Sequence, residues 1–144
     1  MGDLAGGGES EAKVLLVDDR PDNLLALRAV LEPLGLEMVT VTSGEEALKA
    51  LLNQEFSLIV LDVQMPGLDG FETAKLIKQR ERTRHIPIIF LTAISGAEEH
   101  HLAGYASGAI DYVYKPFEPA ILRAKVAALV ELVQVRERLE TEVA

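Results

Sequence analysis

Short apolar runs alternate along the chain with segments in which apolar residues recur every three or four positions. The runs are partly β-branched and apolar on both faces, which is typical of strands buried in a parallel sheet. The segments between them have the spacing of amphipathic helices. We predict strands over 13–18, 36–41, 57–62, 86–91 and 110–114, and helices over 21–33, 44–53, 69–80, 95–107 and 118–140.

The strict alternation of strand and helix predicts an α/β fold with a parallel sheet, because right-handed crossovers place helices over its faces. Two groups of apolar residues at helical spacing should face that sheet. They are Leu24, Leu27, Leu31 and Leu34 in the first helix and Ala47, Leu48, Leu51 and Leu52 in the second.

Acidic residues follow two of the predicted strands. Asp18 and Asp19 come after one apolar run, and Asp62 ends another. The carboxyl edge of such a sheet is where ligands bind. Carboxylates gathered there repel one another and need a cation or a basic side chain, and their oxygen atoms suit Mg²⁺. The alternative is that Asp19 or Asp22 caps the helix near residue 21, and Asp62 the helix after its strand.

Two other strands end in polar residues that carry different chemistry. Thr92 and Ala93 follow one strand, and Lys115 and Pro116 follow the last. A single Thr or Lys at a strand end is usually a solvated turn residue. A hydroxyl, an ammonium and three carboxylates at corresponding ends of four strands indicate one shared site.

Together, Asp18-Asp19, the segment 62–70, Thr92-Ala93 and Lys115-Pro116 resemble the response-regulator receiver domain of two-component signalling, as found in chemotaxis regulators. The resemblance covers residues 12–135. It implies a flavodoxin-like (βα)5 fold with a five-stranded parallel sheet of order 2-1-3-4-5 and helices on both faces. Lys115-Pro116 also matches the family's cis peptide.

The resemblance implies that Asp62 accepts a phosphoryl group from a sensor histidine kinase or a phosphotransfer protein. Asp19, Asp62 and the backbone carbonyl of Gln64 would bind Mg²⁺, and Asp18 would act on the metal through a water molecule. Lys115 would pair with Asp62 and later with a phosphoryl oxygen.

The resemblance also implies a conformational switch. Thr92 would hydrogen-bond a phosphoryl oxygen, and Tyr112 would fill the space that Thr92 leaves. The surface formed by 95–107, 110–114 and the start of the last helix would then bind an output domain or a partner protein.

Two positions are expected to tune the lifetime of the phosphoryl group. Gln64 and Ile94 lie two residues beyond Asp62 and Thr92 and would flank the path of the attacking water. An apolar Ile94 cannot position water by hydrogen bonding, so a long lifetime is predicted.

Composition limits the other functions. A chain of 144 residues with 49% hydrophobic content supports one domain with a sizeable core, and it has no cysteine for disulfides or thiolate metal sites. The net charge of −9 argues against direct nucleic-acid binding. No apolar stretch approaches the ~20 residues that cross a bilayer. We expect a soluble, cytoplasmic protein without membrane contact, with residues 1–11 as a flexible Gly-rich tail.

The last predicted helix continues past the part that resembles a receiver. Residues 136–144 would extend it, and Leu132, Val135, Leu139 and Val143 form a second apolar stripe. A short coiled coil, a linker to an output domain and a frayed tail are all compatible with this pattern. A homodimer is therefore one of the expected arrangements.

Two other function classes remain at this point. A scaffold that works without phosphorylation would keep the fold, but the presence of Asp19, Asp62, Thr92 and Lys115 argues against it. A Mg²⁺-dependent phosphohydrolase with an aspartyl-phosphate intermediate would use the same groups, but the connections are too short for a substrate cap. A phosphoacceptor that is not a conventional enzyme is favoured.

Overall fold

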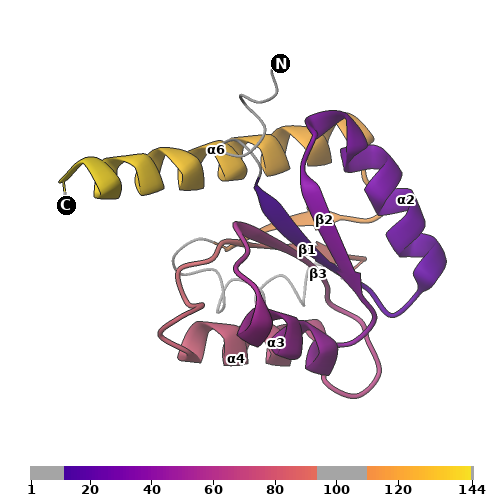
Figure 1. Ribbon diagram of the computed structural model, residues 1–144. Helices are drawn as coiled ribbons and strands as arrows, with labels where there is room; N and C mark the ends of the chain where they lie inside the picture. Colours follow the sequence, from indigo (N-terminus) through magenta and orange to yellow (C-terminus); the bar gives the residue numbers. More distant parts are fainter. Residues whose placement is uncertain (1–11, 94–109, 144) are drawn as a thin grey trace.

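A five-stranded parallel sheet forms the centre of the protein (Figure 1). The computed structural model describes residues 12–93 and 110–143. The strand order is β2-β1-β3-β4-β5, as predicted. The strands are β1 (Lys13–Val17), β2 (Glu37–Val41), β3 (Leu58–Asp62), β4 (Ile88–Thr92) and β5 (Ile110–Tyr114).

The described residues contain four α-helices, and the sheet lies between two pairs of them. Helices α2 (Pro21–Leu31) and α6 (Pro119–Val143) cover one face, and α3 (Gly44–Asn53) and α4 (Gly70–Gln79) cover the other (Figure 1). The predicted helix 95–107 lies outside the described residues. No helix in the described ranges is long and apolar enough to span a membrane.

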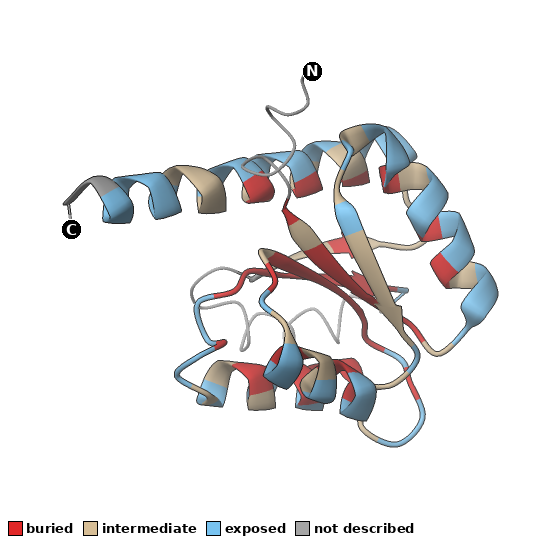
Figure 2. Ribbon diagram, viewed as in Figure 1, coloured by how far each residue is buried: buried red, intermediate tan, exposed pale blue. Residues whose placement is uncertain are grey.

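The sheet divides the core into two clusters because alternate side chains of a strand point to opposite faces. Leu15 and Val17 pack toward α3 and α4, whereas Val14 and Leu16 pack toward α2 and α6. Strands β3 and β4 are buried at every position, as Figure 2 shows for the centre of the sheet. The polar residues at the ends of these strands are therefore held in place by strands that are packed on both faces.

The first helix is shorter than the predicted range 21–33. Helix α2 ends at Leu31 and is followed by the 3₁₀ turn η1 (Glu32–Leu34). Pro33 has no amide hydrogen to donate within an α-helix, and Gly35 then adopts a left-handed conformation with φ of 69°. Leu34 is consequently only partly buried against the core.

The prediction that Leu52 of α3 faces the core is wrong. Leu51 is 2% exposed, whereas Leu52 is 57% exposed. Successive residues of an α-helix point about 100° apart, so the face that buries Ala47 and Leu51 turns Leu52 outward. Leu48 is partly buried at the margin of the same cluster.

The adjacent leucines provide a direct test of this packing. Leu51→Ala should lower the free energy of unfolding by about 2–5 kcal/mol, because it removes buried methyl groups and leaves a cavity. Leu52→Ala should change it by less than about 0.5 kcal/mol. Urea denaturation of both variants measures the difference, and equal losses would contradict the assigned faces.

Candidate functional site

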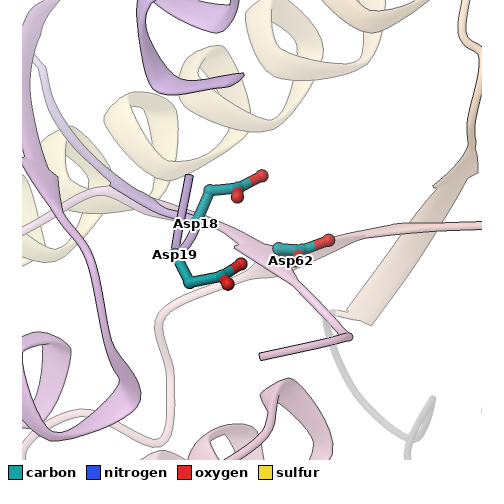
Figure 3. Close-up of side chains that lie close together, drawn as sticks. All are labelled: Asp18, Asp19 and Asp62. Carbon is teal, nitrogen blue, oxygen red and sulfur yellow. The ribbon is translucent and has the colours of Figure 1, made fainter. Parts of the chain in front are cut away.

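Three aspartates meet at the carboxyl ends of β1 and β3 (Figure 3). Val17 of β1 pairs with Leu61 of β3, so Asp18 and Asp62 occupy corresponding positions one residue further along. Asp18 and Asp62 are buried and Asp19 is half-buried. One carboxylate oxygen from each lies within 4.8 Å of the others, so these oxygen atoms could hold a metal ion.

Lys115 reaches this cluster from β5, at the edge of the sheet. It directly follows β5, and its Nζ atom lies 2.9 Å from Oδ1 of Asp62 and 3.7 Å from Oδ2 of Asp18. The backbone N–H of Lys115 donates to the carbonyl of Thr92 over 2.7 Å. This hydrogen bond fixes the backbone of Lys115 beside the end of β4. The Lys115–Pro116 peptide bond is cis, as predicted. Lys115 is therefore the basic group that the acidic cluster requires.

Asp18 is held by donors from the turn that follows β1. The backbone N–H of Arg20 donates to Oδ1 over 3.0 Å, and the side-chain amide of Asn23 lies 3.3 Å from both carboxylate oxygens. Asn23 was not among the residues predicted from the sequence. Its only signal is its place in the first turn of α2, five residues after Asp18.

The capping alternatives for the aspartates are wrong. Arg20 is the N-cap of α2 and no side chain supplies a capping hydrogen bond there, while Asp22 forms a 3.5 Å ion pair with Arg20. Asp69 caps α4 in a capping box with Glu72. The acids at the strand ends are therefore not explained by helix capping.

Burial raises the pKa of the Asp62 carboxyl above its ordinary value. The hydrogen bond from Lys115 opposes this shift, and the negative charges of Asp18 and Asp19 add to it. The net direction means that the ionised Asp62 is held at a cost in free energy. A further cation at the cluster would reduce that cost.

A glycine allows the loop after β3 to fold back against the site. The backbone N–H of Gly70 donates to the carbonyl of Val63 over 2.9 Å. A Cβ atom at Gly70 would collide with the carbonyl oxygen of Asp62 and lie 2.7 Å from Cα of Val63. Only glycine allows α4 to begin so close to the end of β3.

Three of the other predicted site residues lie in the described part of the chain. Thr92 is 1% exposed at the end of β4. Gln64 is exposed in the loop after β3, and the role of its carbonyl stays a prediction. Tyr112 packs on the core, with its ring 5.3 Å from that of Tyr114. Ile94 lies outside the described residues.

A cavity of about 310 Å³ opens beside the Asp18–Lys115 contact. Its lining is formed by Asp18, Asn23, Ala26, Leu27, Leu91, Lys115, Pro116 and Phe117. A cavity of about 320 Å³ at the opposite edge is bordered by Lys13, Arg82 and Glu137 and contains none of the strand-end residues. The first cavity is the one that borders the clustered charges.

The response regulator receiver domain model matches residues 14–127. The chain belongs to this family. It is a receiver domain of two-component signalling, and such domains act with histidine kinases and output domains.

Two curated relatives and one solved structure are similar to this receiver domain. The sensor histidine kinase GacS of Pseudomonas protegens is 43% identical over 107 residues, which are 72% of this chain and 12% of GacS. The response regulator PleD of Caulobacter vibrioides is 37% identical over 118 residues, 82% of this chain and 26% of PleD. The chain thus spans only a small part of these proteins.

The solved structure is the receiver domain of sensor histidine kinase PA1611 from Pseudomonas aeruginosa PAO1, which has a magnesium ion coordinated in its active-site cleft. It is 32% identical, with a TM-score of 0.74, and the match covers 84% of this chain and 98% of that one.

Replacing Asp62 with asparagine should stabilise this receiver domain at neutral pH, because it removes the cost of keeping a buried carboxylate ionised. The pKa of Asp62 is higher in the folded state than in the unfolded state. At pH values between these two pKa values, the folded protein therefore binds more protons than the unfolded protein. Stability therefore falls as the pH rises through that interval, and Asp62→Asn abolishes this loss. Thermal unfolding at several pH values, in a metal-free buffer, measures the gain. A gain that persists below the ordinary pKa of aspartate would contradict this explanation.

Gly70→Ala should destabilise the domain by about 2–3 kcal/mol, because the new methyl group meets backbone atoms that cannot move aside. Gly35→Ala is the matched control, since Gly35 has a positive φ but no atom lies within 4 Å of the place that a Cβ would take. That variant should lose only about 1 kcal/mol from backbone strain. Chemical denaturation compares the two, and a smaller loss for Gly70→Ala would argue against the close approach.

Proposed function

We propose that Asp62 is the phosphoacceptor of this receiver domain and that its phosphorylation switches the surface around β5. The observation that carries the proposal is the contact of Lys115 with Asp62 at 2.9 Å, inside a cluster of buried carboxylates. A buried carboxylate beside a fixed ammonium group can attack phosphorus while the ammonium neutralises the oxygens of the transferring group.

The transfer conserves atoms and charge in a simple way. An Oδ atom of Asp62 attacks the phosphorus of a phosphohistidine on the partner kinase or phosphotransfer protein, and the P–N bond breaks. The electron pair of that bond returns to the imidazole nitrogen, which takes a proton from solvent. The product is a mixed anhydride on Asp62, in which Lys115 is placed to bind a phosphoryl oxygen.

The acidic residues fit a divalent cation. Asp18, Asp19 and Asp62 offer three clustered carboxylate oxygens, and only one ammonium group lies among them in the described structure. Asp19, Asp62 and the carbonyl of Gln64 would hold Mg²⁺, with Asp18 acting through water. When bound, the ion would neutralise charge on the phosphoryl oxygens.

The switch would start at Thr92. Its carbonyl accepts the N–H of Lys115, and in the sheet it pairs with Tyr114, whose ring contacts that of Tyr112. A shift of Thr92 toward the phosphoryl group would therefore reach both tyrosines of β5. An output domain or partner protein would bind the surface that changes in this way. The location of the protein in the cytoplasm stays a prediction.

Phosphorylation with a small phosphodonor tests the proposal. The parent protein, incubated with acetyl phosphate and Mg²⁺, should gain the mass of one phosphoryl group, and omission of Mg²⁺ or the change Asp62→Asn should abolish the gain. Asp22→Asn is the matched control, because Asp22 is an exposed aspartate outside the cluster. It should be phosphorylated like the parent.

Each other outcome has a definite meaning. No mass gain in the parent would overturn the proposal in favour of a scaffold. Rapid consumption of the donor without accumulation of the modified protein would favour a phosphohydrolase. A gain that survives in Asp62→Asn would assign the modification to another residue.

A further inference from the structure

The last helix is longer than the part of it that packs on the domain. Helix α6 has 25 residues, and Leu122, Val126 and Val130 bury its first half against the sheet and α2. None of residues 131–141 is buried. Figures 1 and 2 show this end of α6 extending past the sheet with an exposed surface. A helical segment of this length is marginal in water unless something packs against it.

An apolar row runs along the outer side of this helix. Ala128, Leu132, Val135 and Leu139 follow one another at intervals of four, three and four residues. Leu132 is 51% exposed and Leu139 is 56% exposed. At about 100° per residue, this row lies roughly 150° around the helix axis from the buried face. A partner could therefore bind the row without displacing α6 from the domain.

We propose that this row joins two copies of the chain in a short, parallel, in-register coiled coil. The 4-3-4 spacing matches alternate core positions of a heptad repeat, with Leu132 and Leu139 at a and Ala128 and Val135 at d. The preceding core position is Lys125, which forms a 2.9 Å ion pair with Asp111, so the coiled coil begins at Ala128.

The charges beside the row are complementary to those of a second copy in parallel orientation. Glu131 occupies position g and Arg136 the next position e, and both are exposed or partly exposed. In a parallel pair, g of one helix faces e of the next heptad in the other, so Glu131 meets Arg136 of the other copy twice by symmetry. This complementarity makes the chain a partner for itself.

Fewer than two heptads are involved, so the dimer should be weak and is best detected by cross-linking. The chain has no cysteine, and a single introduced thiol is therefore unique. Under mild oxidation, full-length Leu139→Cys should form a disulfide-linked dimer in several-fold higher yield than Thr141→Cys. Thr141 is also exposed near the same end of α6 but lies on the other side of the helix from the row.

Orientation and charge are tested separately. In a mixture of Ala128→Cys and Leu139→Cys chains, a parallel pair gives disulfides only between identical variants, whereas an antiparallel pair gives the mixed disulfide. In the Ala128→Cys background, Glu131→Arg should reduce the dimer yield several-fold, and adding Arg136→Glu should restore it. Circular dichroism verifies that each variant is folded.

Three results would overturn the inference: equal yields from Leu139→Cys and Thr141→Cys, predominance of the mixed disulfide, or failure of the charge exchange to restore the dimer. The dimer does not depend on Asp62, so these experiments use unphosphorylated protein. Their failure would leave the proposed phosphoryl transfer untouched, and failure of phosphorylation would leave the dimer untouched.

Discussion

The ammonium group of Lys115 holds together a set of charges that would otherwise repel one another. Asp18 and Asp62 are almost fully buried, and Nζ of Lys115 is within 4 Å of both. This contact requires that β1 lies beside β3 and that the Lys115 side chain passes over the end of β4, which separates β5 from β3. It also requires the backbone hydrogen bond from Lys115 to Thr92. The order and register of the sheet are therefore prerequisites for the site.

The neutralisation by Lys115 is incomplete, and this incompleteness suits the site to its family's chemistry. Burial and the neighbouring acids raise the pKa of Asp62 even though Lys115 opposes the shift. A site with balanced charges would be more stable but would have little affinity for a cation. The charge imbalance that costs folding free energy is thus the same property that attracts a further positive charge to the cluster.

Much of this arrangement could be predicted from the sequence, because a parallel sheet turns the order of residues along the chain into neighbours in space. Each strand-end residue of the site follows or ends an apolar run, and the strand order brings them to one edge. The role of Gly70 depends instead on how closely α4 approaches the end of β3. The pattern of apolar and polar residues along the chain does not predict that distance. Leucines at helical spacing likewise predict that a helix has a buried face, but they do not predict how wide that face is. The buried face of α3 includes Leu51 and excludes Leu52, which the spacing alone predicts to be buried. The same periodicity allowed a continuous helix through Pro33, whose missing amide hydrogen ends the α-helix.

Helix α6 gives the site a physical connection to the far end of the domain. It begins four residues after Lys115 and continues for 25 residues, a length of about 37 Å. Its first half packs on the core through Leu122, Val126 and Val130, and its second half continues from this anchored part. A tilt of a few degrees near Lys115 would displace the other end by about 2 Å at this length. A contact made by the distal part of the exposed row would therefore respond to such a tilt more than a contact near Lys115 would.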